Sequence, residues 1–142
     1  MKSIKPSIGV SSFSVLMLFC AFICSLCMSA STPKEKGEIK FEDTIHDFGY
    51  VKENGGPISV EFPFINAGSA NLVIYEAKAE CGCTTPDYPK APVAPGKGGT
   101  IKVTYNPLGR PGAFDKVVTV KTNGKPAKVR LKIRGTVTPK SK

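Results

Sequence analysis

Apolar and polar residues alternate in a series of short segments along this chain of 142 residues. Most of the segments are followed by Gly, Pro or Asn, and the segments are 38–42, 45–51, 58–65, 72–79, 100–105, 114–122 and 127–134. A period of two is typical of strands with one buried face, and no run of helical period is long enough to compete with it. About seven such strands predict an all-β fold, an immunoglobulin-like antiparallel β-sandwich over residues 38–137, with a small barrel as the alternative.

Gly and Pro residues predict local irregularities in these strands. Gly49 interrupts the segment 45–51, and a Gly inside a strand indicates a bulge or a change of sheet. Pro63 has no N–H to donate, so its strand should lie at a sheet edge there or carry a bulge. The prolines of residues 84–99 predict a stiff, extended crossing, and Asn123-Gly124 predicts a hairpin turn.

The first 30 residues have the pattern of a secretory signal peptide. Lys2 and Lys5 precede an uncharged, apolar run over 8–28, and Met28-Ser29-Ala30 provides a signal-peptidase site. We predict cleavage after Ala30. The protein is therefore expected to be exported, to the periplasm, the cell envelope or the outside of the cell.

Two alternatives keep this leader at the membrane. The uncharged run is about as long as a membrane span needs, so it could remain as an N-terminal anchor. Cys20, Cys24 or Cys27 could carry a lipid, although none of them follows a small residue as a lipoprotein signal requires. We expect membrane contact only in these two cases. Beyond the leader, a polar linker spans 31–37, and a flexible tail, 138–142, ends the chain.

Charge is distributed unevenly along the chain, which carries a formal net charge of +9. Residues 97–142 contain twelve Lys and Arg residues and a single acid, Asp115. Such a basic half could bind an anionic partner, but many of these residues alternate with Val, Leu or Ile, as on the solvated face of a strand. We therefore favour a solvated face, and the predicted export argues against nucleic acid as a partner.

Cys81-Gly82-Cys83 holds the only two cysteines beyond the leader. They are too close in the sequence to form a disulfide between facing sheets, and the chain has no Trp. The core of the predicted sandwich must therefore consist of Phe, Val, Ile, Leu and Tyr side chains. In an extended strand, residues i and i+2 share a face, with Cα atoms about 6.6 Å apart. A disulfide tolerates roughly 4.4–6.8 Å, and Gly82 lets the backbone contract. We therefore favour a local Cys81–Cys83 disulfide, or a buried thiol pair, that shapes this corner.

Two other interpretations of the cysteine pair stay open. Two thiolates on one face suit Cu(I) or Zn(II), but two ligands do not complete a zinc site. His46 is the only other soft or borderline ligand beyond the leader. Thiol redox exchange is the remaining interpretation, although thioredoxin-type motifs space their cysteines by two residues at a helix N-terminus.

Two common enzyme motifs are absent from the sequence. It contains neither a nucleophile elbow nor a phosphate-binding loop, so we predict no enzyme, no catalytic residue, no resident metal and no cofactor. Arg110, between Gly109 and Gly112, could present its guanidinium to an anion, but a turn shaped by Gly and Pro is the favoured explanation of this segment.

Several short motifs of the predicted domain resemble one bacterial family. They are Asp47-Phe48-Gly49, Phe64-Ile65-Asn66-Ala67-Gly68, Cys81-Gly82-Cys83-Thr84-Thr85-Pro86, Pro95-Gly96, Tyr105-Asn106-Pro107, Gly112-Ala113-Phe114 and Lys121-Thr122-Asn123-Gly124. In this order, over Ile39 to Val137, they resemble the domain-of-unknown-function family 1573. The resemblance implies an immunoglobulin-like domain, similar to those of major sperm protein and cilia-associated proteins, in secreted or lipid-anchored proteins common in Bacteroidetes-type bacteria.

The chain departs from this family pattern in two ways, with Tyr88 in place of an expected Trp and without a lipoprotein signal. The resemblance brings no reaction. Leader, strands and resemblance together predict a secreted, non-enzymatic module of the cell envelope. We expect it to bind or assemble with an envelope protein or a glycan through loops and a strand edge, with strand addition at 58–65 as one mode. The alternative is soft-metal capture or thiol redox chemistry at Cys81 and Cys83.

Overall fold

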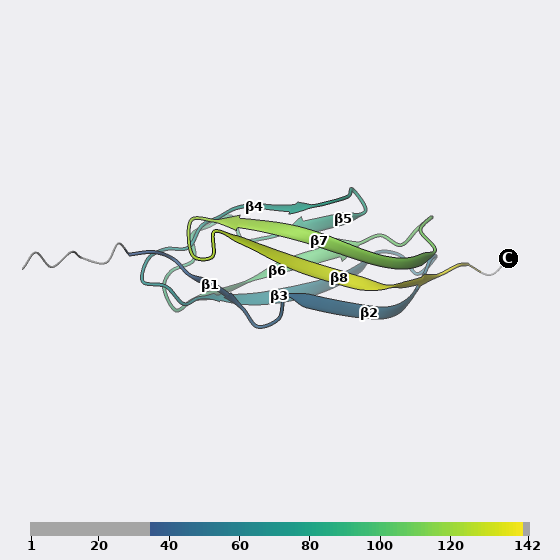
Figure 1. The fold of residues 1–142 in the computed structure, drawn as a ribbon, viewed down its shortest axis with the longest axis horizontal. Helices are drawn as coiled ribbons and strands as arrows, with labels where there is room; N and C mark the ends of the chain where they lie inside the picture. The colour runs from purple at the N-terminus through teal and green to yellow at the C-terminus, as the bar shows by residue number, and fades with distance from the viewer. Residues whose placement is uncertain (1–34, 141–142) are drawn as a thin grey trace, which may run out of the picture. The chain divides into compact units, whose positions relative to one another are not determined.

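The computed structural model describes residues 35–140, which form two four-stranded β-sheets packed face to face (Figure 1). The strands are β1 (Ile39–Phe41), β2 (Ile45–Lys52), β3 (Ile58–Asn66), β4 (Ile74–Ala79), β5 (Thr84–Asp87), β6 (Gly98–Tyr105), β7 (Gly112–Thr122) and β8 (Lys128–Thr138). The first sheet has the order β1-β3-β6-β5, and the second has the order β2-β8-β7-β4. This arrangement confirms the predicted immunoglobulin-like sandwich over the barrel.

The structure has one strand more than the sequence predicts, because the proline-rich segment after the cysteines begins with β5. This strand pairs with β6, with Thr85 opposite Thr104 and Asp87 opposite Lys102. Pro86 lies between Thr85 and Asp87, at a position whose backbone groups face away from β6. It therefore costs the sheet no hydrogen bond.

Strands β2 and β8 form the one parallel pair in the described part of the chain, whereas the sequence predicts an antiparallel sandwich. All other strand pairs are antiparallel, and outside the strands one isolated bridge, between Glu38 and Lys125, is parallel. The chain leaves the first sheet after β1, crosses through residues 42–44, and enters the second sheet beside the last strand. Alternation of apolar and polar residues reports which face is buried and carries no information on strand direction, so the sequence could not reveal this pairing.

Both predicted irregularities are present. Gly49 has a left-handed φ of 64°, and the pairing of β2 with β8 shifts register between Asp47 and Tyr50. Strand β1 pairs only with the last three residues of β3, and the Glu42 N–H donates to the Pro63 carbonyl at 3.4 Å where this pairing ends. Pro63 therefore lies where β3 becomes a sheet edge.

The core lies between the two sheets and is built from the inward side chains of alternating residues. The most deeply buried are Phe62, Leu72, Ile101, Val103, Tyr105, Val118, Val120, Leu131, Ile133 and Val137. The rings of Tyr105 and Phe114 stack with their centroids 4.1 Å apart. Burying a side chain of this size contributes about 1.5–3 kcal/mol, so these rows stabilise the sandwich without a Trp or an inter-sheet disulfide.

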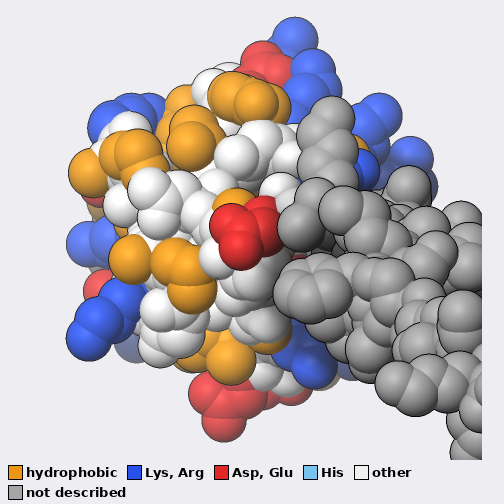
Figure 2. All heavy atoms as spheres, turned by 90° about the vertical axis from the view of Figure 1, so that its left-hand side faces the viewer, with side chains coloured by type: hydrophobic (Ala, Val, Ile, Leu, Met, Phe, Trp, Pro, Cys, Tyr) orange, Lys and Arg blue, Asp and Glu red, His pale blue; other side chains and the backbone are white. Residues whose placement is uncertain are grey.

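Asn66 is completely buried at the end of β3, where three segments meet. Its Oδ1 accepts hydrogen bonds from the N–H groups of Glu38 (3.1 Å) and Gly68 (3.0 Å). Its Nδ2 donates to the carbonyls of Ala70 (2.8 Å) and Val93 (2.9 Å). Figure 2 shows this end of the domain, where apolar side chains are divided into small groups among polar atoms.

The predicted leader, residues 1–30 with three of the cysteines, lies outside the described residues, as do 31–34 and 141–142. The last residue of the predicted linker, Gly37, is buried, and its carbonyl accepts a hydrogen bond from the Lys125 N–H at 2.9 Å. At the other end, β8 continues to Thr138. Within residues 35–140, no helix is long and apolar enough to cross a membrane.

Candidate functional site

Cys81 and Cys83 lie in the turn between β4 and β5. A disulfide joins them, and their Cα atoms are 5.3 Å apart. This distance is shorter than the spacing of about 6.6 Å in an extended strand. The backbone contracts here because the Thr84 N–H donates to the Cys81 carbonyl at 3.2 Å and closes a turn. The structure thus agrees with the disulfide interpretation of this motif.

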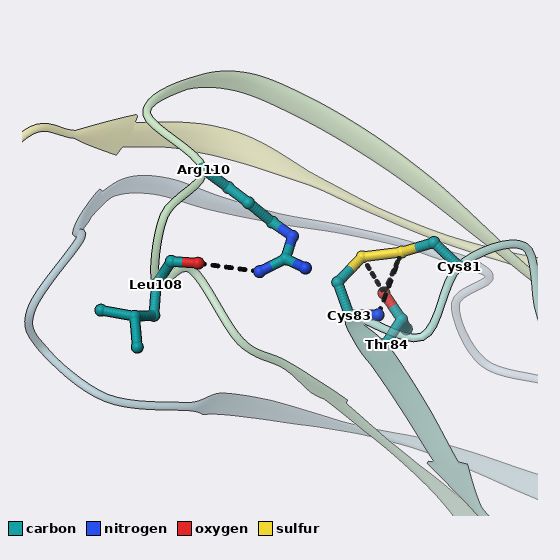
Figure 3. The surroundings of a disulfide bond; sticks show 5 residues. All are labelled: Cys81, Cys83, Thr84, Leu108 and Arg110. Atoms are coloured by element: carbon teal, nitrogen blue, oxygen red, sulfur yellow. Dashed lines mark hydrogen bonds between the residues drawn. A yellow bond between two sulfur atoms is a disulfide. The ribbon is translucent and has the colours of Figure 1, made fainter.

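The two sulfur atoms have different surroundings. Cys83 is 7% exposed, whereas Cys81 is partly exposed. The Thr84 hydroxyl oxygen lies 3.6 Å from the Cys83 sulfur and 3.9 Å from the Cys81 sulfur. Figure 3 shows the Arg110 guanidinium, from the loop between β6 and β7, directed toward the disulfide. Its Nη1 donates to the Leu108 carbonyl at 2.8 Å, so a cation is held facing the sulfur atoms.

The sequence indicated Arg110 only as a guanidinium in a turn, because no pattern of neighbouring residues predicts that it lies close to the cysteines. The link is the pairing of β5 with β6, which places Thr84 opposite Tyr105. One residue further, the Asn106 N–H donates to the Cys83 carbonyl at 2.9 Å. The loop that carries Arg110 therefore begins beside Cys83.

His46 is not brought to the cysteines. It lies on β2, whereas the cysteines follow β4, and these strands form the two opposite edges of the second sheet. Its ring packs edge-on against Phe48, with centroids 4.6 Å apart. In the described part of the chain, no group of three or more His, Cys, Asp or Glu residues could hold a metal ion. The three residues of the metal interpretation therefore do not form one site.

The first half of β3 is an open sheet edge. In an antiparallel strand, the N–H and C=O of one residue face the same neighbour, and every second residue repeats that direction. The Pro63 carbonyl faces β1, because it accepts the Glu42 N–H. Ser59 and Glu61 therefore face the same side, but β1 ends at Phe41 and does not reach them. Within residues 35–140, no backbone group pairs with Ser59 or Glu61 on this side.

A hollow of about 250 Å³ lies where β1 ends and this open edge begins. Its lining residues are Lys40, Phe41, Glu42, Pro63, Phe64 and Ile65. Ile65 is 52% exposed, so the hollow has an apolar wall that water reaches. Each of the other edges carries an irregularity: β5 has Pro86 facing outward, β2 is broken by the bulge at Gly49, and the pairing of β4 shifts register after Ile74.

A second hollow, of about 410 Å³, lies on the outer face of the second sheet, where two of the sequence motifs meet. Asp47 contributes from the first motif and Ala113 from the second, with Arg134 between their strands. The Asp47 Oδ1 accepts the Gly49 N–H at 2.8 Å, and its Oδ2 accepts the Arg134 Nε–H at 2.9 Å. Tyr50, which is 84% exposed, also lines this hollow.

These contacts make the contribution of Asp47 to stability depend on pH. The Gly49 N–H, and then the Arg134 guanidinium, hold the pKa of Asp47 below its ordinary value of 3.8. Because the folded-state pKa is lowered, the ionised carboxylate stabilises the fold above the ordinary pKa, and this stabilisation is lost as the pH falls through the folded-state pKa. We expect Asp47→Asn to lower the midpoint of thermal unfolding at neutral pH, with a difference from wild type that shrinks below pH 3.8.

Scanning calorimetry at neutral pH and in acid measures this difference. Asp43→Asn is the control, because Asp43 is exposed and makes no side-chain hydrogen bond in the described structure. A difference between Asp47→Asn and wild type that stays constant down to the acid limit would show that the carboxylate charge is not responsible.

Two facing sheets, with a chain that moves from one sheet to the other after its first strand, define an immunoglobulin-like β-sandwich domain. Solved structures share this fold. A protein of unknown function from Porphyromonas gingivalis W83 matches with a TM-score of 0.64 at 14% identity, over 78% of this chain and 51% of that chain. The VesB protease of Vibrio cholerae matches with a TM-score of 0.55 at 12% identity, over 71% of this chain and 32% of that chain.

The secreted serine protease VesC of Vibrio cholerae matches with a TM-score of 0.54 at 13% identity, over 70% of this chain and 23% of that chain. The chain thus spans about half the length of the Porphyromonas protein and less of each protease. At these identities the likeness concerns the fold alone.

The family model described as "Protein of unknown function (DUF1573)" matches residues 39–137. The chain therefore belongs to the DUF1573 family, as its motifs indicated. A comparison with curated proteins finds no match.

Proposed function

We propose that this protein is a non-enzymatic binding module of the cell envelope, which takes an extended segment of a partner protein as an additional strand beside β3. The open edge at Ser59 and Glu61 carries the proposal. Export to the envelope is supported by the signal-peptide pattern of the first 30 residues. The non-enzymatic character is supported by a sequence that contains neither a nucleophile elbow nor a phosphate-binding loop.

The added strand would run antiparallel to β3, in line with β1, and would pair with the part of β3 that lies beyond the end of β1 at Phe41. Ser59 and Glu61 each offer one N–H and one C=O to it, and each hydrogen bond contributes about 0.5–1.5 kcal/mol net. The hollow between Phe41 and Pro63 can receive one apolar side chain of the incoming segment. Backbone pairing then supplies affinity, and the hollow supplies preference for particular side chains.

Glu61→Pro tests this proposal, because it removes one N–H from the open edge and leaves the hydrogen bonds between β3 and β6 in place. Glu61→Ala keeps the N–H and is the matched control. With a photo-crosslinking residue at position 59 in cells, we expect wild type and Glu61→Ala to crosslink to the same envelope protein. Glu61→Pro should lose that product by about tenfold, which corresponds to the loss of about 1.4 kcal/mol of binding.

Two outcomes would contradict strand addition. One is equal crosslinking in Glu61→Pro and Glu61→Ala. The other is the same product, in the same yield, from a crosslinker at Thr85 on the opposite edge of the sheet.

A glycan is the second candidate partner, and the hollow around Tyr50 favours it. An exposed aromatic ring beside a fixed pair of Asp47 and Arg134 allows a pyranose ring to stack and to form hydrogen bonds. Binding to envelope polysaccharide that is lost in Tyr50→Ala, together with no crosslinked protein at position 59, would assign this partner instead.

A further inference from the structure

We propose that the Cys81–Cys83 disulfide is a thiol–disulfide exchange site that accepts two electrons from a protein dithiol. Cys81 is the sulfur that is attacked, Cys83 is the leaving thiolate, and the Arg110 guanidinium stabilises this thiolate. The inference is independent of strand addition at β3, because the cysteines lie beside β5, which β6 separates from β3.

Exposure of the two sulfur atoms sets the direction of attack. An incoming thiolate has to reach one sulfur along the line of the S–S bond, and which sulfur it can reach depends on access. Cys81 is partly exposed, whereas Cys83 is 7% exposed and belongs to the core. The attack therefore falls on Cys81, and the electrons of the broken bond go to Cys83.

The surroundings of Cys83 favour its departure as a thiolate. A nearby cation lowers the pKa of a thiol, and a thiol of lower pKa is a faster leaving group. Arg110 points toward the disulfide (Figure 3), and its bond to the Leu108 carbonyl holds it in this direction. The Thr84 hydroxyl, 3.6 Å from the Cys83 sulfur, can turn its hydrogen toward the thiolate.

The fold does not depend on this disulfide. The bridge closes a loop with a sequence separation of only 2, so its entropic contribution to stability is small. The bond from the Thr84 N–H to the Cys81 carbonyl and the bond from the Asn106 N–H to the Cys83 carbonyl hold the same corner through the backbone. The pair can therefore be reduced and reoxidised without unfolding the sandwich.

The exchange balances in two steps. In the first step, one thiolate of the dithiol attacks the Cys81 sulfur, the Cys81–Cys83 bond breaks, and Cys83 leaves as a thiolate. In the second step, the other thiolate of the dithiol attacks the dithiol sulfur that is now bonded to Cys81. The bond between this sulfur and Cys81 breaks, and Cys81 leaves as a thiolate. The dithiol has become a disulfide and has lost two protons, and Cys81 and Cys83 have gained two electrons and those protons.

Equilibration of the full-length folded protein with dithiothreitol tests the inference. Samples at increasing ratios of reduced to oxidised dithiothreitol are quenched in acid, alkylated and digested with trypsin. Cleavage after Lys78 and Lys90 releases a peptide that contains Cys81 and Cys83 and none of the leader cysteines. We expect this peptide to gain two alkyl groups under native conditions, while the circular dichroism of the protein is unchanged.

Arg110→Gln separates an exchange site from a merely accessible bridge. We expect this variant to need about a tenfold higher ratio of reduced to oxidised dithiothreitol for half reduction, and to be reduced more slowly, because the Cys83 thiolate has lost its cation. Arg130→Gln, which removes an exposed cation from β8, is the control and should behave as wild type.

Two results would overturn the inference. The first is a peptide that stays unalkylated at every ratio until denaturant is added, since the bridge would then be closed to exchange. The second is identical reduction of Arg110→Gln and Arg130→Gln, since Arg110 would then not act on the leaving thiolate. The dithiothreitol measurements do not depend on the crosslink at position 59. Failure of the strand-addition proposal can therefore be distinguished from failure of the exchange-site proposal.

Discussion

Asn66→Ala is expected to lower the free energy of unfolding by at least about 3 kcal/mol. The side chain is completely buried and makes four hydrogen bonds, all to backbone groups of other residues. Its removal leaves two N–H groups and the Ala70 carbonyl unpaired, whereas the Val93 carbonyl keeps the Leu72 N–H. Each group left unpaired away from water costs about 1–3 kcal/mol. Urea unfolding followed by circular dichroism measures the change.

The size of this effect follows from what Asn66 joins. It connects the segment before β1, the turn after β3 and the loop before β6, which are three separate parts of the chain. Asn54→Ala is the control, because Asn54 is exposed in a turn, and a surface change of this kind costs at most about 0.5 kcal/mol. Equal midpoints for the two variants would show that the buried bonds of Asn66 do not stabilise this end of the sandwich.

Gly68→Ala is expected to destabilise the protein by about 3 kcal/mol, at the upper end of the range for overpacking. A Cβ at this position would collide with the backbone of Lys36, Gly37 and Glu38. These atoms belong to a segment that is itself held by hydrogen bonds, including one from the Ser69 N–H to the Lys36 carbonyl at 3.1 Å. The segment before β1 must therefore move away, which also weakens the bonds of Asn66.

Gly82→Ala is the matched control for this substitution. A Cβ on Gly82 meets no atom within 4 Å, and Gly82 does not have a positive φ. Thermal unfolding of both variants should therefore show a large decrease of the midpoint for Gly68→Ala and almost none for Gly82→Ala. Similar midpoints would mean that residues 36–38 do not pack against the turn after β3.

Features that depend on a few neighbouring residues were predictable from the sequence. The alternation of apolar and polar residues determined the strands and their buried faces. Gly49 indicated the bulge, and Pro63 indicated the point where β3 becomes an edge. The one-residue spacing of Cys81 and Cys83 allowed a local disulfide. In each case, the physical cause acts within a few positions along the chain.

The positions that shape the candidate sites depend instead on contacts between distant segments. Pairing of β5 with β6 brings the Arg110 loop to Cys83, and the opposite edges of the second sheet separate His46 from the cysteines. The early end of β1 leaves the β3 edge open. None of these relations leaves a periodic or local signal, because the same alternating strands could pair in another order with the same faces buried.

The sequence by itself determined that this chain builds a two-sheet sandwich with a cysteine pair at one turn. Only the tertiary structure decided that β2 lies parallel to β8, that Asn66 joins three segments, and that a guanidinium faces the disulfide. The reason is that burial is encoded residue by residue, whereas strand order and loop contacts are chosen by the packing of the whole domain.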